Sequence, residues 1–257
     1  MRTNTLKRKL QSGKRVCGVL VEINHPDVIE LVGHLGYDFV FLDGQHCSLN
    51  PDLARNLIRA ADLTGMTSLV RVPKNDPAVI LEYLDAGAGG IIVPNIMNRA
   101  ETEAMVAATK YPPVGIRGGF GRSRAANYGL TQTQVEYFTK TNDEILCIPL
   151  VEDEGALPHI KDIASTPGVD IVLTGPGDMA LSMGIPGGWS DPRVQAGVAK
   201  VLAAAKGAQK PAMIVALNLA NARELYAQGF QVIMTTAISL LTASGKDFIQ
   251  GCGRDQA

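Results

Sequence analysis

Short apolar runs rich in β-branched residues recur along the chain, and helix-like stretches separate them. Eight such runs lie at residues 16–22, 38–44, 67–73, 89–95, 145–152, 169–176, 211–217 and 230–236. Their hydrophobicity is nearly continuous and does not alternate strictly, which is typical of strands buried on both faces of a parallel sheet. The pattern therefore predicts a parallel sheet whose strands are joined by helices.

The stretches between these runs carry the start and stop signals of helices. Several of them begin after Asn, Asp or Pro and end at Gly, at residues 51–65, 76–87, 98–110 and 220–229. A short opening helix is predicted at residues 6–13, closed by Gly13. Eight alternating strand and helix units favour an α/β fold of the closed (β/α)₈ barrel type, although the pattern alone leaves an open doubly wound sheet as an alternative.

Composition adds few constraints on function. A chain of 257 residues has the usual length of one such barrel, so we expect a single (β/α)₈ barrel domain over residues 1–257. The formal net charge of -1 gives no reason to expect binding to nucleic acid or to an anionic membrane. No apolar stretch is long enough to predict export or a membrane span.

The cysteines also indicate a compartment. They are scattered, with no CxxC pair, at positions 17, 47, 147 and 252. A chain this long does not need disulfides to be stable, so we expect a reduced, cytoplasmic protein.

Polar side chains follow several of the predicted strands, where the active sites of such barrels form. These strand ends carry Asp43, Gly44, Gln45 and His46 after the second strand, Arg71 at the third, Glu152, Asp153 and Glu154 at the fifth, and Gly175 to Asp178 at the sixth. Because the carboxyl ends of all strands meet at one mouth, we expect these groups to converge there.

Each group has a chemical interpretation and a structural alternative. Glu152 and Asp178 offer hard oxygen ligands for Mg²⁺, Mn²⁺ or Co²⁺, or they cap helices and form salt bridges. Arg71 offers a planar fork for a carboxylate or a developing enolate oxygen, or it forms a salt bridge with Asp43. His46 is a candidate general acid/base that Asp43 orients, or it is merely hydrogen-bonded within the loop.

Two further features bear on the chemistry. The longest gap between strands, residues 111–143, contains GIRGGFGRSR, whose glycines and Arg117, Arg122 and Arg124 suit the binding of an anion, or a mobile solvated loop. We expect this segment to contribute to substrate choice. A Schiff-base aldolase is disfavoured, because the sixth strand has no lysine and Lys74 is expected on a surface loop.

Several stretches, in this order along the chain, resemble the HpcH/HpaI aldolases, which are metal-dependent class II pyruvate aldolases. They are FLDGQH, LVRVPKNDP, LDAGAGGIIVPNI, KYPPVGIRG, LVEDEGA and TGPGDMALSMG. That family includes the 4-hydroxy-2-oxoheptanedioate and 2-dehydro-3-deoxyglucarate aldolases. The resemblance covers nearly the whole chain.

The resemblance implies roles for particular residues. Glu152 and Asp178 would ligate the divalent metal, Arg71 would bind the pyruvyl oxygen, and His46 with Asp43 would transfer protons. Backbone amides around Gly177 and Asp178 would hold the pyruvate carboxylate. The resemblance also implies a homo-oligomer, a hexamer built as a trimer of dimers that exchange their last helices.

Two positions depart from the family pattern: Gln45 stands where Glu is usual, and Leu150 where Gln is common. Both changes remove polarity near the expected metal site. The working hypothesis is an aldolase that cleaves or forms 4-hydroxy-2-oxo acids, to pyruvate and an aldehyde, through a metal-held pyruvate enolate. The alternatives are a lyase or decarboxylase acting on oxaloacetate or a CoA ester, and a barrel that binds 2-oxo acids without turning them over.

Overall fold

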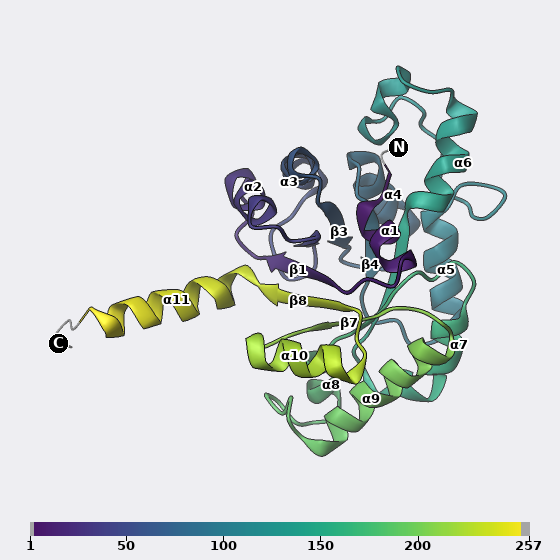
Figure 1. Ribbon diagram of the computed structural model, residues 1–257. Coiled ribbons are helices and arrows are strands. Elements are labelled where there is room, and N and C mark those ends of the chain that lie inside the picture. The colour runs from purple at the N-terminus through teal and green to yellow at the C-terminus, as the bar shows by residue number, and fades with distance from the viewer. Residues whose placement is uncertain (1–2, 253–257) are drawn as a thin grey trace.

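The strands form a closed parallel barrel in chain order, β1 to β8, in a computed structural model that describes residues 3–252 (Figure 1). Their bounds are β1 Val16–Val21, β2 Phe39–Asp43, β3 Thr67–Arg71, β4 Gly90–Val93, β5 Leu146–Val151, β6 Val172–Thr174, β7 Ala212–Val215 and β8 Val232–Thr236. All eight predicted strands are present, and the predicted (β/α)₈ barrel is confirmed.

Helices surround this barrel. The α-helices are α1 Thr5–Gln11, α2 Pro26–His34, α3 Pro51–Thr64, α4 Pro77–Ala86, α5 Arg99–Thr109, α6 Gln134–Glu144, α7 Ile160–Ser165, α8 Pro176–Ser182, α9 Pro192–Gly207, α10 Leu219–Gln228 and α11 Ala237–Gly251. Two 3₁₀ segments, η1 Arg124–Gly129 and η2 Glu154–His159, lie in the connections. No helix within residues 3–252 is long and apolar enough to cross a membrane.

Local chemistry explains where these helices begin and end. The side chains of Asn50 and Asp76 accept hydrogen bonds from the first-turn amides of α3 and α4. Gly65 and Gly87 end the same helices with φ of 79° and 109°, a left-handed conformation that costs glycine little. The predicted opening helix is confirmed as α1, and Gly13 follows it at φ 74°.

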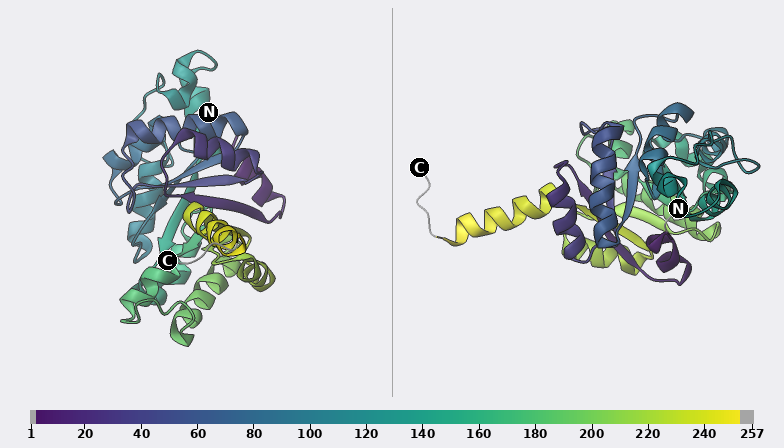
Figure 2. Two further views of the ribbon diagram at one scale, coloured as in Figure 1. Left: turned by 90° about the vertical axis from the view of Figure 1, so that its left-hand side faces the viewer. Right: turned by 90° about the horizontal axis from the view of Figure 1, so that it is seen from above.

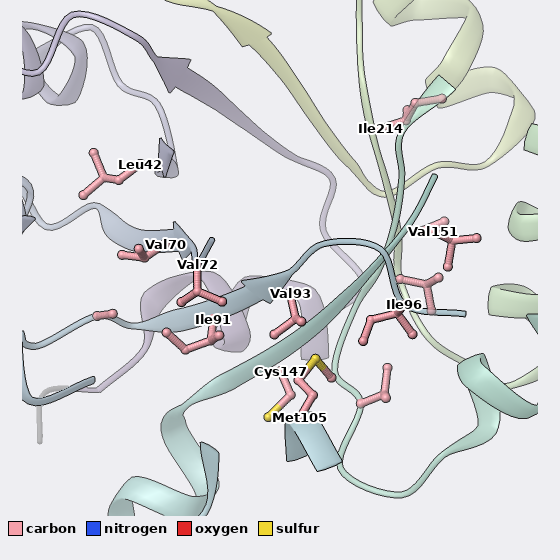
Figure 3. Close-up of a cluster of buried hydrophobic side chains, with 14 of the residues drawn as sticks. Leu42, Val70, Val72, Ile91, Val93, Ile96, Met105, Cys147, Val151 and Ile214 are labelled. Carbon is pink, nitrogen blue, oxygen red and sulfur yellow. The ribbon is translucent and has the colours of Figure 1, made fainter. Parts of the chain in front are cut away.

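Two apolar cores hold the barrel together. The larger core lies between the strands and the outer helices and includes Leu42, Val70, Ile91 and Val151 (Figure 3). The smaller core fills the barrel interior with the alternate side chains of the same strands, and these include Phe41 and Leu69. Burial on both faces accounts for the continuous hydrophobicity of the strands.

Helix α1 closes the amino-terminal end of the barrel. Its Leu6 and Leu10 belong to the interior core, and the side chain of the preceding Asn4 donates to the carbonyl oxygens of Gly89 and Glu144 at 2.8 and 3.0 Å. The barrel is therefore stoppered at this end.

The long segment at residues 111–143 lies at the same, amino-terminal end. The side chain of Arg117 is fully buried and donates to Asp85 at 2.8 Å, while Arg124 pairs with Asp62 and donates to the carbonyl of Ala86. These partners stand near the carboxyl ends of α3 and α4, which run antiparallel to the strands. The segment follows helix α5 and not strand β4 directly, so it lies at the end of its own barrel opposite the carboxyl ends of the strands. Its expected contribution to substrate choice stays a prediction.

Helix α11 leaves the barrel instead of covering it. In Figures 1 and 2 it projects from the end of β8 away from all other elements. None of its residues is buried, and its large apolar side chains are exposed, including Ile238, Leu240, Leu241, Phe248 and Ile249. Such a face requires a partner surface to be removed from water.

Candidate active site

The open mouth of the barrel is lined by inward-facing side chains that lie two residues beyond the interior core along their strands. Along β2 and β3 the inward positions Phe41 and Leu69 are followed, two residues later, by Asp43 and Arg71. The strand register pairs Asp43 with Arg71 directly. The same alternation beyond the core residue Leu150 brings Glu152 to the mouth from β5.

Asp43 and Arg71 form a buried two-pronged ion pair. The Arg71 Nε and Nη2 atoms donate to the two carboxylate oxygens of Asp43 at 2.9 and 2.6 Å, and only 2% of Asp43 is exposed. Burial alone raises the pKa of Asp43, but the hydrogen bonds and charge of Arg71 outweigh it and the net shift is downward. The salt bridge considered from the sequence is present, and it fixes the plane of the guanidinium.

Asp43 also organises the loop that follows β2. Its Oδ1 atom accepts the backbone N–H of Gln45 at 2.9 Å and that of His46 at 3.3 Å. Asp43 thus positions His46 through the backbone, while the imidazole itself is exposed. The side chain of Gln45 is half-buried, and within residues 3–252 its Oε1 atom is buried without a hydrogen-bond partner.

Glu152 and Asp178 come together at the other side of the mouth. Glu152 is 3% exposed, and its Oε1 accepts the backbone N–H of Asn95 at 3.0 Å. Burial raises the pKa of Glu152 to about 7, the Asn95 amide opposes this rise, and the nearby charge of Asp178 adds to it. Two carboxyl groups this close favour sharing a proton or a cation over standing both ionised and alone.

Gly175 leaves the space that Glu152 occupies. It follows β6, and a Cβ atom built on it would lie 2.8 Å from Glu152 Cβ and 3.0 Å from Glu152 Oε2. The same atom would lie 3.2 Å from Leu150 Cδ1. The absence of a side chain here allows β5 and β6 to hold the carboxylate in place, and Leu150 gives it an apolar floor.

The donor set fits a hard divalent cation. Two carboxylates, the buried Glu152 after β5 and the half-buried Asp178 in the first turn of α8, supply oxygen ligands and leave further positions for water and substrate. Among the described residues no group of three or more His, Cys, Asp or Glu side chains could hold a metal ion, so the candidate donors are these two carboxylates.

The sequence patterns missed two contributors to this mouth. Asn95 donates to Glu152 from a left-handed backbone, at φ 55°, in the turn after β4, and no local signal marks this conformation in a residue other than glycine. Glu22 follows Val21, which pairs with Leu42, so the register places it beside Asp43. Its position at the end of a predicted strand was a usable signal.

Lys74 lies on an exposed loop after β3, as predicted. Its side chain is 64% exposed and its Nζ lies 3.2 Å from Asp76. An exposed, paired lysine is a poor nucleophile for a Schiff base.

Comparison with known proteins identifies the family. The family described as HpcH/HpaI aldolase/citrate lyase matches residues 17–241. The chain is 40% identical to the hydroxypyruvate/pyruvate aldolase of Sagittula stellata over 195 residues, which is 76% of each chain. It is 33% identical to the 5-keto-4-deoxy-D-glucarate aldolase of Shigella dysenteriae over 228 residues, 88% of this chain and 87% of the relative.

A solved structure agrees with these relatives. The crystal structure of an HpcH/HpaI aldolase/citrate lyase family protein from Burkholderia cenocepacia superposes with a TM-score of 0.93 at 30% identity, covering 98% of this chain and 100% of that one. The two chains therefore share one fold over nearly their whole length. The chain belongs to the HpcH/HpaI aldolase/citrate lyase family.

Proposed function

We propose that the protein is a metal-dependent pyruvate aldolase, which cleaves or forms 4-hydroxy-2-oxo acids to pyruvate and an aldehyde. The observation that carries this proposal is the pairing, in one mouth, of a clamped guanidinium at Arg71 with two adjacent carboxylates at Glu152 and Asp178. Relatives named as pyruvate and keto-acid aldolases support the same reaction class.

Glu152 and Asp178 would hold the cation, which is Mg²⁺, Mn²⁺ or Co²⁺. When bound, it would supply positive charge that polarises the 2-oxo group and stabilises negative charge on that oxygen. The apolar floor beneath Glu152 limits competition from water for this charge.

Arg71 binds the oxygen on which charge develops. Its Nε and Nη2 atoms are engaged by Asp43, so Nη1 is the nitrogen left to donate to the substrate. Because Asp43 fixes the guanidinium before substrate arrives, little reorganisation is needed when the enolate forms. Backbone amides around Gly177 and Asp178 hold the carboxylate of the substrate.

His46 and Gln45 complete the site on the solvent side. In cleavage, His46 or a water that it relays to takes the proton of the 4-hydroxyl group, the C3–C4 bond breaks, and its electron pair moves to form the enolate. The aldehyde leaves, and protonation at C3 gives pyruvate. Gln45 contributes an uncharged amide beside this proton transfer, at a position where the family pattern has a charged Glu.

The test is exchange of the pyruvate methyl protons with D₂O, followed by ¹H NMR in the presence of Mg²⁺. Exchange should need the cation, stop with EDTA, and be lost in Glu152→Gln while remaining in Glu103→Gln, a matched change on the outer helix α5. Exchange that survives exhaustive chelation would contradict the proposal. Release of CO₂ from oxaloacetate, without cleavage of 4-hydroxy-2-oxo acids to an aldehyde, would favour the decarboxylase alternative.

We also infer that the chain forms a homo-oligomer through helix α11, as a hexamer built from dimers that exchange this helix. Its exposed apolar face and its separation from its own barrel support this assembly. Phe248, which is 76% exposed, is suited to test it, because Phe248→Asp should lower the molar mass measured by light scattering. An unchanged mass would contradict the role of the helix.

Four free cysteines support a cytoplasmic location.

A further inference from the structure

Glu22 places a carboxylate at the mouth on the side away from the proposed cation site. It comes directly after β1, and the register puts it beside Asp43, whereas Glu152 and Asp178 come from β5 and from the helix after β6. Leu20, two residues before Glu22, packs against the interior core, so Glu22 belongs to the same inward-facing set. The side chain of Glu22 is half-buried and its Oε2 accepts the backbone N–H of Ile238 at 3.2 Å.

A second observation locates the charge of Glu22. The thiol of Cys47, in the loop after His46, has its pKa raised by burial, by Asp43 and by Glu22. The Cys47 sulfur lies 4.0 Å from Asp43 Oδ2. The Glu22 carboxylate is therefore close to the β2 loop as well as to the first turn of α11.

The charges of the other groups at the mouth cancel once a divalent cation is bound, so Glu22 leaves a net negative charge. Asp43 and Arg71 neutralise each other, and Glu152 and Asp178 would be neutralised by a divalent cation. Among the inward-facing residues described here, Glu22 contributes the remaining negative charge. A substrate that reaches from Arg71 toward β1 meets this charge with its far end.

We propose that Glu22 lines the aldehyde subsite and selects uncharged, hydroxyl-bearing aldehydes over aldehydes that carry a carboxylate. This inference rests on the proposed aldolase function and names its substrate class. A carboxylate accepts hydrogen bonds from hydroxyl groups and repels a second carboxylate. Cleavage or synthesis would then join pyruvate to a neutral hydroxyaldehyde.

The structure also gives Glu22 an anchoring role, through its bond to Ile238 at the start of α11. A Glu22→Gln change keeps an acceptor oxygen for that bond and removes the charge. A Glu22→Asp change keeps the charge and shortens the reach to Ile238. The two variants therefore separate selection by charge from anchoring of the helix.

The experiment measures kcat/KM for pyruvate addition to glyceraldehyde and to tartronate semialdehyde, which differ only in a terminal CH₂OH or COO⁻ group. Wild type should prefer glyceraldehyde. Glu22→Gln should lower that preference by roughly five- to tenfold, the scale of one like charge about 8 Å away in a partly solvated site. Glu22→Asp should retain the preference, and Glu224→Gln, an exposed change on α10, should not alter it.

Raised salt supplies an independent readout, because it should weaken the wild-type preference and leave that of Glu22→Gln nearly constant. A wild-type preference for the carboxylated aldehyde, condensation of neither aldehyde, or equal changes in the Gln and Asp variants would overturn the inference. Methyl-proton exchange of pyruvate needs no aldehyde. If the wild type does not catalyse this exchange, the proposed function itself is overturned.

Discussion

Gly175→Ala tests whether the contact between β5 and β6 holds the carboxylate of Glu152 in place. The added Cβ would stand 2.8 Å from Glu152 Cβ and 3.0 Å from Oε2, against about 3.5–4.0 Å for a favourable carbon–carbon contact. The φ of Gly175 is -106°, so alanine suffers no backbone strain and the effect is steric. Because Glu152 Cβ is fixed to a central strand, the clash must be relieved by a displacement of roughly 0.5–1 Å.

Two magnitudes follow from this displacement. Overpacking should lower the free energy of unfolding by about 1–3 kcal/mol. Loss of a well-placed ligand should weaken cation binding by roughly 10- to 100-fold, as changes behind a metal ligand commonly do. Both follow from the same movement, so they should appear together.

The assay is titration of the metal-free protein with Mn²⁺ by calorimetry, together with chemical denaturation. Gly207→Ala is the matched control, because a Cβ atom there has nothing within 4 Å. The control should bind Mn²⁺ as wild type does. Wild-type Mn²⁺ affinity in Gly175→Ala would refute the reasoning and would remove Glu152 from the metal site.

Three further predictions concern the clamp and the loop beside it. Arg71→Lys keeps the charge and loses the fork, so turnover should fall by roughly 10²- to 10³-fold with little change in fold, and unchanged turnover would make Arg71 purely structural. Folding lowers the pKa of Asp43, so the ionised carboxylate stabilises the folded state at pH values above about 4, the ordinary pKa of an aspartate. This stabilisation is lost as the pH falls through the lowered pKa of the folded state. Asp43→Asn should therefore make the free energy of unfolding depend less on pH in the acid range. Because it leaves Arg71 unpaired, it should also lower the free energy of unfolding at neutral pH by about 3–5 kcal/mol. If the variant and the wild type show the same acid dependence, the pair does not stabilise the fold. Gln45→Glu should move the acidic limb of the pH profile of kcat/KM to higher pH, by on the order of one pH unit, because a carboxylate near His46 favours the imidazolium form. An acidic limb that does not move would mean that His46 is not the base or that residue 45 does not lie near it.

The barrel was predictable because its strands are buried on both faces and its helices carry clear caps. The run FVFL at 39–42 has no polar side that could place it in another type of sheet, and Asn50 with Gly65 delimits α3 as expected. The strand ends also predicted Asp43, Arg71 and Glu152 at one mouth. These features depend on local periodicity, which a single sequence records.

Features that depend on three-dimensional packing were not predictable. The left-handed turn at Asn95 has no glycine to announce it, and the fit of Gly175 against Glu152 requires knowing that β5 and β6 are neighbours at that height. The end of the barrel at which the arginine segment lies is set by the helix at 98–110, which stands between this segment and β4. That helix reverses the chain direction and so decides which end of the barrel the following loop occupies.

The stopper formed by α1 has a kinetic consequence. With Leu6 and Leu10 filling the amino-terminal end, every molecule that reaches the mouth arrives and departs by one opening. In the proposed reaction pyruvate lies against Arg71, and the aldehyde lies between it and solvent. Aldehyde must then depart before pyruvate in cleavage and bind after it in synthesis, which makes the order of events compulsory and makes pyruvate a competitive inhibitor of the 4-hydroxy-2-oxo acid.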